Sequence, residues 1–395
     1  MLRVSRLASS VIPSATLAAA ARAKQLQAQG IKIHDFSLGE PDFPTPAPIR
    51  ESALKAIEGG KTKYTPASGT LELRNAVATL YKGMGLGIAP DEVLISNGAK
   101  HSLHNAMAAA LDPGDEVLIP TPYWVSYSDL VSMTGAVPVL LPTTLDEGFR
   151  LPAARLAKAV TSKTRMVLLN SPSNPTGAVY TRAELESIAK VVLENNLSVI
   201  SDEIYERLVY DGSVSTCFAT LHPDLPKRTI TISGVSKTYS MTGWRIGWAV
   251  GPKPIIAAMG NIQSQETSCP SSVSQAAAVT AITMDQACVE EMRKEFQVRR
   301  DHVVARLNRM PGLRCPVPGG AFYAFFDVQG ALGRDIAGRK IATDQDFCDG
   351  ALNDGHVCLV PGSAFGAPGH ARLSFAAGLK ELDQGLDALE AWLRS

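Results

Sequence analysis

The segment GVSKTYSMTGWRIGW places a lysine, Lys237, shortly before an arginine, Arg245. Elsewhere the chain offers a carboxylate, Asp202, soon followed by a phenol, Tyr205, and the rigid turn NSPSNPTG presents the amide of Asn174. A lysine amine can form a Schiff base, and a nearby acid can stabilise the charge that develops in such chemistry. The residue types therefore indicate Schiff-base chemistry.

Two more segments complete this set of groups. Gly98 and Ala99 follow the apolar run Val93–Ser96 and open a helix. A glycine at such a turn exposes backbone N–H groups at the positive end of the helix, which suits a phosphate. Trp124, in the aromatic segment TPYWVSY, offers a flat surface.

The elements that must position these groups are short apolar runs that alternate with helical stretches such as Ala99–Leu111 and Arg182–Asn195. Most runs are continuous, as is typical of strands buried on both faces of a mainly parallel sheet, so we expect an open α/β sheet. Ligands bind beyond the carboxyl ends of such strands, so the groups above should converge on one site. The runs are Val93–Ser96, Glu116–Pro120, Val137–Leu141, Met166–Asn170, Ser198–Asp202, Thr229–Ser233 and Gly247–Gly251.

The pattern changes after about residue 285. A charged amphipathic helix over Glu290–Met310 precedes the run AFYAFFDV, an apolar run His356–Val360 and a terminal helix near Glu381–Leu393. We predict a large domain over residues 46–288 and a smaller α+β domain over 289–395. Residues 1–45 are rich in turns and are expected to form an arm or lid strand that joins the small domain.

Composition limits the classes of partner. The 395 residues are 45 % hydrophobic and carry 38 basic and 38 acidic side chains, which gives no electrostatic reason to bind nucleic acid or an anionic membrane. No apolar run approaches the roughly 18 residues of a membrane span. The N-terminus has no acidic residue before Asp35, as in transit peptides. We expect a cytoplasmic protein, with organelle import as the alternative.

Other ligand-binding patterns fail. GGKT at Gly59–Thr62 has Lys55 where a phosphate-binding loop of the Walker type needs its first glycine, GMGLG at Gly83–Gly87 is an incomplete dinucleotide pattern, and no GxSxG occurs. His101 and His104 could offer two metal ligands on one helix, but no cysteine or carboxylate stands near in register. We therefore expect no metal, ATP or NAD site.

One cofactor needs the groups that are present. Pyridoxal 5′-phosphate requires a lysine for a Schiff base, an acid for its ring nitrogen, phosphate ligands and a flat surface. A carboxylate about 4 Å from the ring nitrogen gains about 4 kcal/mol at an effective dielectric constant of about 20. That energy equals about three pKa units, enough to keep the ring protonated at neutral pH. Asp202 is the predicted partner of the ring nitrogen.

The chain resembles the class I, fold-type I, pyridoxal-phosphate-dependent aminotransferases and is most similar to their bacterial aspartate aminotransferase branch. The resemblance runs nearly end to end, through PSAT, SLGEPDFPTP, KTKYTPASG, NSPSNPTG, SDEIYE, SKTYSMTGWRIGW and PGSAFGAPGHARLSFA. It implies a fold with a mainly parallel seven-stranded sheet in the large domain. It also implies a homodimer with shared active sites.

The resemblance implies roles for the cofactor-binding groups. Lys237 would form the Schiff base and carry the proton from the substrate Cα, and Asn174 and Tyr205 would bind the ring phenolate. Trp124 would stack on the ring. Further ligands of the phosphate are implied: Arg245, the Gly98 and Ala99 amides, and Tyr64 from the neighbouring subunit.

The resemblance also implies substrate contacts. Arg372, in GHARLSFA, would bind the substrate α-carboxylate with the help of the Gly39 backbone. Thr16 and Lys100 match positions that contact the distal carboxylate in the aspartate branch. Members of this branch that accept prephenate carry a lysine just before PSAT, where this chain has Ile12. We therefore expect aspartate and 2-oxoglutarate as substrates in a ping-pong mechanism, and no prephenate activity.

Two alternatives use the same cofactor. One is an aminotransferase of other or broad specificity (alanine, aromatic) and the other is a β-lyase, and Lys100 with Thr16 are the features that discriminate among them. A regulatory protein that senses pyridoxal phosphate would need an additional DNA-binding domain and a basic face, which this neutral chain does not offer.

Overall fold

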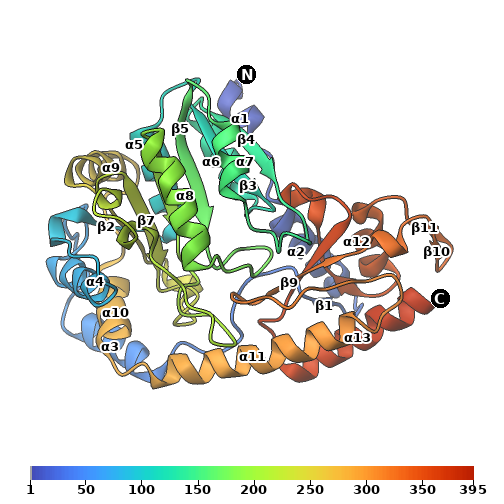
Figure 1. Cartoon of the computed structure of the whole chain (residues 1–395). Helices are drawn as coiled ribbons and strands as arrows, with labels where there is room; N and C mark the ends of the chain where they lie inside the picture. Colours follow the sequence, from blue (N-terminus) through green and yellow to red (C-terminus); the bar gives the residue numbers. More distant parts are fainter. Residues whose placement is uncertain (1) are drawn as a thin grey trace.

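A computed structural model describes residues 2–395 and shows two parts, each built on a sheet (Figure 1). The larger sheet has seven strands in the order β2-β8-β7-β6-β5-β3-β4. β8 is antiparallel to both its neighbours, and the other pairs are parallel. The predicted α/β fold is confirmed, since each predicted run coincides with a strand. The strands are β2 (Val93–Ser96), β3 (Glu116–Thr121), β4 (Val137–Pro142), β5 (Thr164–Asn170), β6 (Ser198–Asp202), β7 (Thr229–Gly234) and β8 (Gly247–Val250).

Helices cover both faces of this sheet, which explains why most strands are continuously apolar. In β5, Met166 and Leu168 face the hydrophobic cluster formed with α5, α6 and α9, whereas Val167 and Leu169 face the cluster formed with α7 and α8. Alternate side chains of a strand point to opposite faces, so both sets must be apolar. The helices are α5 (Ala99–Ala110), α6 (Ser126–Met133), α7 (Ala153–Ala159), α8 (Arg182–Glu194) and α9 (Lys253–Glu266).

The second part is a three-stranded antiparallel sheet in the order β13-β14-β9. The predicted apolar run His356–Val360 is divided, because β12 pairs with the N-terminal strand β1 while β13 pairs with β14. A small hairpin joins β10 to β11. The strands are β1 (His34–Asp35), β9 (Tyr323–Asp327), β10 (Asp335–Ile336), β11 (Arg339–Lys340), β12 (Val357–Cys358), β13 (Val360–Pro361) and β14 (His370–Ser374).

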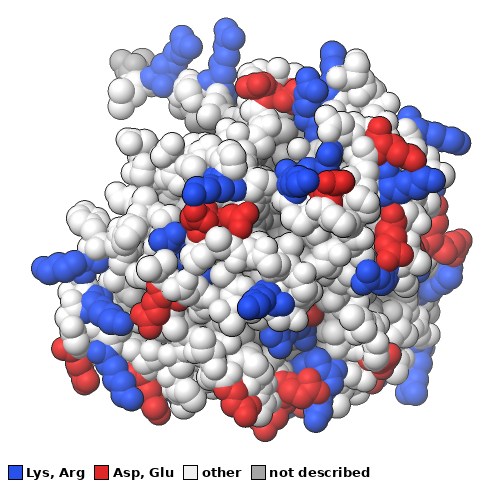
Figure 2. Space-filling model, turned by 60° about the vertical axis from the view of Figure 1, so that its left-hand side comes forward, with Lys and Arg blue, Asp and Glu red and all other residues white. Residues whose placement is uncertain are grey.

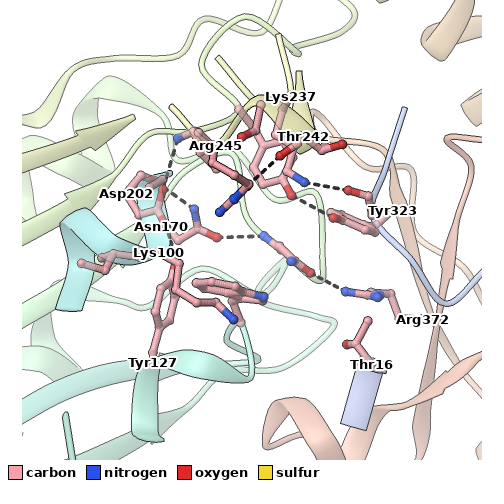
Figure 3. Close-up of a pocket in the computed structure, with 18 residues that line it drawn as sticks. Thr16, Lys100, Tyr127, Asn170, Asp202, Lys237, Thr242, Arg245, Tyr323 and Arg372 are labelled. Carbon is pink, nitrogen blue, oxygen red and sulfur yellow. Dashed lines mark hydrogen bonds between the residues drawn. The ribbon is translucent and has the colours of Figure 1, made fainter. Parts of the chain in front are cut away.

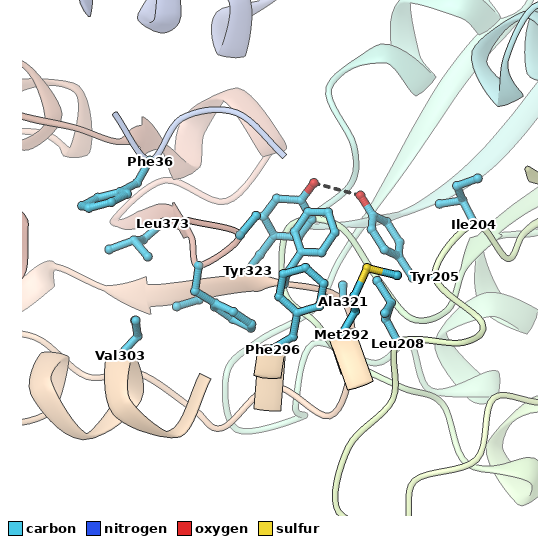
Figure 4. Packing of buried hydrophobic residues seen from close by; sticks show 14 of the residues in the cluster. Phe36, Ile204, Tyr205, Leu208, Met292, Phe296, Val303, Ala321, Tyr323 and Leu373 are labelled. Carbon is cyan, nitrogen blue, oxygen red and sulfur yellow. Dashed lines mark hydrogen bonds between the residues drawn. The ribbon is translucent and has the colours of Figure 1, made fainter. Parts of the chain in front are cut away.

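A single hydrophobic cluster extends from the larger to the smaller part (Figure 4). The long helix α11 runs beneath both parts in Figure 1 and contributes Met292, Phe296 and Val303 to this cluster. The parts therefore share a continuous core rather than a wet interface. The remaining helices are α3 (Ala47–Glu58), α4 (Leu71–Gly83), α10 (Ser272–Thr283), α11 (Ala287–Leu307), α12 (Asp344–Asn353) and α13 (Leu379–Arg394).

The N-terminal segment is more helical than expected. α1 spans Arg6–Ser10 and α2 spans Ala15–Ala28, and within residues 2–45 the only strand is the short β1; the role of this segment as an arm stays a prediction. The α2 sequence ATLAAAARAKQLQA is rich in alanine, the strongest helix former. Its buried residues Ala23 and Leu26 pack against Leu352 and Cys358. Pro13 separates the two helices, as its missing N–H group requires.

The surface has mixed charge on the face that Figure 2 shows, where Lys and Arg side chains stand among Asp and Glu side chains. This agrees with equal numbers of 38 basic and 38 acidic residues in the chain. Within residues 2–395, no helix combines the length and the apolar character that a membrane span requires.

Candidate active site

A cavity of about 220 Å³ lies where the carboxyl ends of β5, β6 and β7 meet the three-stranded sheet (Figure 3). Four cations and one carboxylate line it, so the cavity carries an excess of positive charge suited to an anionic ligand. Its lining includes most of the predicted site residues: Thr16, Gly39, Ala99, Lys100, Trp124, Asn174, Asp202, Tyr205, Lys237, Arg245 and Arg372.

Lys237 lies just beyond β7, and its side chain enters the cavity. Its Nζ donates a hydrogen bond to the carbonyl oxygen of Gly39 at 2.7 Å. Burial lowers the pKa of Lys237 to about 8; Arg245 and Arg372 also lower it, and Glu40 opposes the shift. About a tenth of this amine is therefore neutral, and nucleophilic, at pH 7, far more than for an ordinary lysine.

Asp202 ends β6 at the floor of the cavity. The hydroxyl of Tyr127 donates to Asp202 Oδ2 at 2.6 Å, and the backbone N–H of Ile204 donates to Oδ1 at 3.2 Å. Burial raises the pKa of Asp202 to about 6, and both hydrogen bonds oppose that rise. The carboxylate is thus held in place and ionised at neutral pH, and a cationic partner would stabilise it further.

Arg372 comes from β14 and is 1 % exposed. Its Nη1 donates to Asn174 Oδ1 at 2.9 Å, and its Nη2 donates to the carbonyl oxygen of Ser37. The guanidinium lies between the rings of Tyr323 and Phe365, at 4.6 and 4.8 Å from their centroids. No carboxylate of the described residues pairs with this buried cation.

Two buried polar atoms at this end of the cavity have no hydrogen-bond partner within residues 2–395, Arg372 Nε and Thr16 Oγ1. A buried cation without an ion-pair partner is costly, as is a buried hydroxyl without a hydrogen bond. Carboxylates of a ligand would satisfy these groups. The unpartnered atoms therefore favour an anionic ligand in this cavity.

The opposite end of the cavity is built from the start of α5. Gly98 precedes the helix with a φ of 88°, a conformation that favours glycine. A Cβ atom on Gly98 would lie 2.3 Å from Arg245 Nη2, so the guanidinium packs directly on this turn. Arg245 itself donates to the carbonyl oxygen of Thr242 at 2.7 Å. A helix N-terminus and an arginine thus face the same point, an arrangement that suits a phosphate.

Trp124 and Lys100 form one wall of the cavity. Lys100 Nζ lies 4.8 Å from the centroid of the Trp124 ring, within the range of a cation–π contact. Burial lowers the pKa of Lys100, Arg245 lowers it further, and Asp129 opposes them. The Trp124 ring meets Tyr127 edge to face at 5.4 Å.

Sequence reasoning missed two tyrosines that the structure places in the cavity. Tyr127 stands in the quoted segment TPYWVSY, so its position near Trp124 was a usable signal. Tyr323 stands in AFYAFFDV, which was interpreted only as a strand. Its hydroxyl is 2.8 Å from that of Tyr205, and either can donate. The remaining lining residues not predicted are Leu103, Asn170, Ile204, Ser236 and Thr242.

Two predicted residues are not among those that line the cavity. Gly98 directly precedes the lining residue Ala99, and Tyr64 lies elsewhere. Tyr64 is 90 % exposed and borders a surface groove with Lys61 and Lys63. A contact with a neighbouring subunit therefore stays a prediction for this residue.

His101 and His104 bind the same carboxylate. Glu266 of α9 lies 3.2 Å from His101 Nε2 and 2.9 Å from His104 Nε2. The expectation that no carboxylate stands near these histidines was wrong, because α9 packs beside α5 and supplies one from far along the chain. In the described part of the chain, no three His, Cys, Asp or Glu side chains are arranged to hold a metal ion.

Comparisons with known proteins show the family of this chain. The family model described as aminotransferase class I and II matches residues 31–389. An aspartate aminotransferase of Rhizobium meliloti is 47 % identical over 97 % of this chain and 94 % of its own length. An aspartate/prephenate aminotransferase of Cereibacter sphaeroides is 43 % identical over 97 % of this chain and 96 % of its own.

Solved structures give the same result. The crystal structure of the aspartate aminotransferase from Rhizobium meliloti matches with a TM-score of 0.97 and 46 % identity, covering 100 % of this chain and 99 % of that one. The aspartate aminotransferase from Thermus thermophilus with maleate matches with a TM-score of 0.93 and 38 % identity, covering 99 % of this chain and 100 % of that one. With the family model matching most of its length, the chain belongs to the class I and II aminotransferase family.

Proposed function

We propose that this aminotransferase binds pyridoxal 5′-phosphate and transfers the amino group of aspartate to 2-oxoglutarate in a ping-pong reaction. The observation that carries the proposal is the position of Lys237. Its buried amine lies in one cavity with the carboxylate of Asp202 and with two arginines, Arg245 and Arg372. An amine among a carboxylate, a phosphate site and a carboxylate site is the arrangement that this cofactor and an amino acid require.

The residues of the cavity fit the cofactor. The Gly98–Ala99 turn and Arg245 suit its phosphate, and the Trp124 ring offers a surface for stacking. Asp202 would pair with the ring nitrogen, while Asn174 and Tyr205 would bind the ring oxygen. Bound pyridoxal phosphate supplies an aldehyde that takes up the amino group and a cationic ring that withdraws electrons from the substrate Cα.

Lys237 would serve as the proton carrier. In its neutral form, the amine would remove the proton from the substrate Cα. Burial lowers the pKa of Lys237 to about 8, and a general base acts best when its pKa lies near the working pH. The hydrogen bond to Gly39 joins the amine to the N-terminal segment, which also accepts a hydrogen bond from Arg372 through the carbonyl of Ser37.

Arg372 would bind the α-carboxylate and Lys100, with Thr16, the distal carboxylate. The α-carboxylate is common to both substrates, so one buried arginine can serve the amino donor and the oxo-acid acceptor. The Thermus thermophilus enzyme was solved with maleate, a compound with two carboxylates. That ligand is consistent with a site that binds a carboxylate at each end.

Prephenate is a second candidate substrate. The Cereibacter sphaeroides relative is named an aspartate/prephenate aminotransferase, and prephenate also carries two carboxylates. Ile12, where a lysine stands in the prephenate-accepting members, is 71 % exposed and does not line the cavity. We retain aspartate as the main amino donor and no prephenate activity as the expectation.

The proposal includes a cytoplasmic homodimer in which Tyr64 reaches the neighbouring subunit's phosphate site. Its exposure of 90 % leaves its hydroxyl accessible for this contact. The proposed division of the chain at residues 45 and 288 places the cofactor groups in the large domain and Arg372 in the small one.

The test is a set of half-reactions followed by absorption. Protein loaded with pyridoxal phosphate is mixed with aspartate, glutamate, alanine, phenylalanine or, in the reverse direction after amination, prephenate. We expect aspartate and glutamate to remove the visible band much faster than alanine or phenylalanine. A protein that gains no visible band with the cofactor, or that releases pyruvate and ammonia from aspartate, would refute the proposal.

A further inference from the structure

Tyr323 makes three contacts at the centre of the cavity that the proposed reaction has not used. It stands on β9, which pairs with β14, the strand that carries Arg372. Its ring centroid lies 4.6 Å from the Arg372 guanidinium, and its hydroxyl lies 2.8 Å from that of Tyr205 (Figures 3 and 4). Tyr323 and Tyr205 are 2 % and 3 % exposed, so water does not compete for this hydrogen bond.

The Tyr323 hydroxyl also packs against Gly39, the residue whose carbonyl accepts the hydrogen bond from Lys237. A Cβ atom on Gly39 would lie 1.8 Å from Tyr323 Oη, so only a glycine allows this approach. The carbonyl of the same Gly39 accepts the hydrogen bond from Lys237. The position of Tyr323 is therefore fixed by Gly39 on one side and by the Arg372 guanidinium on its ring face.

The hydrogen bond has a direction once a ligand lies beside Tyr205. Among residues 2–395, each of the two hydroxyls has only the other as its hydrogen-bond partner. If Tyr205 donates its proton to the ring oxygen of the cofactor, its own oxygen must accept from Tyr323. A phenol that accepts a hydrogen bond becomes a stronger donor, because hydrogen bonds in a chain polarise one another.

We propose that Tyr323 is a positioning residue that links the carboxylate site at Arg372 to the Tyr205 hydroxyl. Through this link, a substrate bound at Arg372 alters the hydrogen bond that Tyr205 donates to the cofactor. This inference rests on the proposed function, because it assigns Tyr205 to the ring oxygen. Asn174 provides one link, through its hydrogen bond with Arg372, and Tyr323 provides a second, through the contact of its ring with the guanidinium.

The charges around Tyr205 and Tyr323 determine whether substrate binding strengthens or weakens the hydrogen bond that Tyr205 donates to the cofactor. Burial raises the pKa of Tyr323, and the Arg372 cation opposes that rise. A carboxylate bound to Arg372 would cancel part of this opposition and make Tyr323 a weaker donor. The other charged groups near the pair are Asp202, which raises the pKa of Tyr205, and Lys237, whose Nζ lies 6.0 Å from the centroid of the Phe322 ring. Substrate binding would therefore weaken the hydrogen bond that Tyr205 donates to the ring oxygen, and a bound cofactor would then keep its proton to a higher pH.

The experiment measures the pH dependence of the visible band in the loaded protein. Tyr323→Phe keeps the ring over Arg372 and removes only the hydroxyl. We expect the spectroscopic pKa to move up by about half a unit, the effect of losing one neutral hydrogen bond. We also expect saturating maleate to change this pKa less in Tyr323→Phe than in the parent protein.

A double-mutant cycle shows whether Tyr323 shifts the spectroscopic pKa through Tyr205 or through a general disturbance of the cavity. In a Tyr205→Phe background, adding Tyr323→Phe should produce no further shift, because the chain is already broken. Tyr210→Phe is the matched control, since this buried hydroxyl bonds to the backbone of Ala321 and does not line the cavity. It should leave the spectroscopic pKa unchanged.

The affinity for maleate separates the contribution of the Tyr323 ring from that of its hydroxyl. Tyr323→Phe should bind maleate within about twofold of the parent, whereas Tyr323→Leu, which loses the ring beneath Arg372, should bind it about tenfold more weakly. An unchanged spectroscopic pKa in Tyr323→Phe, or an equal shift in the presence and absence of the Tyr205 hydroxyl, would overturn the inference. A parent protein without a visible band would instead refute the proposed function.

Discussion

Residues that follow the strands of the seven-stranded sheet line one side of the cavity, and residues from the three-stranded sheet and the N-terminal segment line the other (Figure 3). The first side holds Lys237, Asp202 and Arg245, the groups proposed for the cofactor. The second side holds Arg372 and Thr16, the groups proposed for the substrate carboxylates. Apart from Lys100, which comes from α5 and is proposed for the distal carboxylate, cofactor and substrate would thus be bound by different parts of the fold.

Three hydrogen bonds join the two sides. Asn174 accepts from Arg372 at 2.9 Å, Gly39 accepts from Lys237 at 2.7 Å, and the hydroxyls of the remaining pair, Tyr205 and Tyr323, are 2.8 Å apart. Each bond pairs a proposed cofactor-binding group with a group on the substrate side. A ligand bound on the second side would therefore contact groups that are already hydrogen-bonded to the first side.

The largest effect should come from the first side. Lys237→Ala should reduce turnover by about a thousandfold or more, because the Cα proton would lose its proposed carrier and the cavity's other lysine, Lys100, lies against Trp124 and is proposed for the distal carboxylate. Steady-state rates with aspartate and 2-oxoglutarate measure this. Lys163→Ala, which removes an exposed lysine, should leave the rate unchanged. If Lys237→Ala kept its turnover within tenfold of the parent protein, Lys237 would not be the residue that carries the Cα proton.

On the second side, Arg372→Ala should lower kcat/KM for aspartate and alanine alike by about 100-fold, because both amino acids share the α-carboxylate. Cofactor content, read from the visible band, should stay unchanged. If this variant loses the cofactor but keeps normal kcat/KM after reloading, then the two sides do not have separate tasks.

Lys100→Ala should affect the reactions of aspartate and alanine differently. We expect kcat/KM for aspartate to fall about tenfold, the effect of one partly buried ion pair, while alanine is unaffected. The two substrates are compared on the same preparation. Equal losses for both would show that Lys100 supports the wall formed by Trp124 rather than the distal carboxylate.

The smallest effect should come from Tyr127→Phe. The Tyr127 hydroxyl lowers the pKa of Asp202 against the effect of burial, so its removal should raise that pKa. Asp202 binds a ring cation only when ionised, so cofactor retention should be lost at a pH about one unit higher than in the parent. Equilibrium dialysis of the cofactor between pH 5 and 8 measures this. A retention profile that does not move would remove Tyr127 from the cofactor side.

The two sides also differ in how far sequence predicts them. The seven strands could be predicted because each is a continuous apolar run, and the groups that follow a parallel strand must appear at one edge of the sheet. Asp202 and Lys237 were placed in this way. β4 shows the limit of the pattern, since Val137 and Leu140 are exposed at the edge of the sheet.

The second side is built from strands as short as two residues and from turns. β1, β12 and β13 are too short to show a period, so the pairing of the N-terminal segment with β12 could not be derived from spacing. Arg372 was identified only through the family resemblance. Tyr323 was missed because its neighbours made the segment look like a core strand, and only tertiary packing brings its hydroxyl to Tyr205.

The transfer of labelled nitrogen tests the central claim most directly. Aspartate carrying isotopically labelled nitrogen is incubated with 2-oxoglutarate and the loaded protein, and the label is followed by mass spectrometry. The account predicts that all transferred label appears in glutamate, with one oxaloacetate formed for each glutamate. Label recovered as free ammonia, or glutamate formed without label, would contradict it.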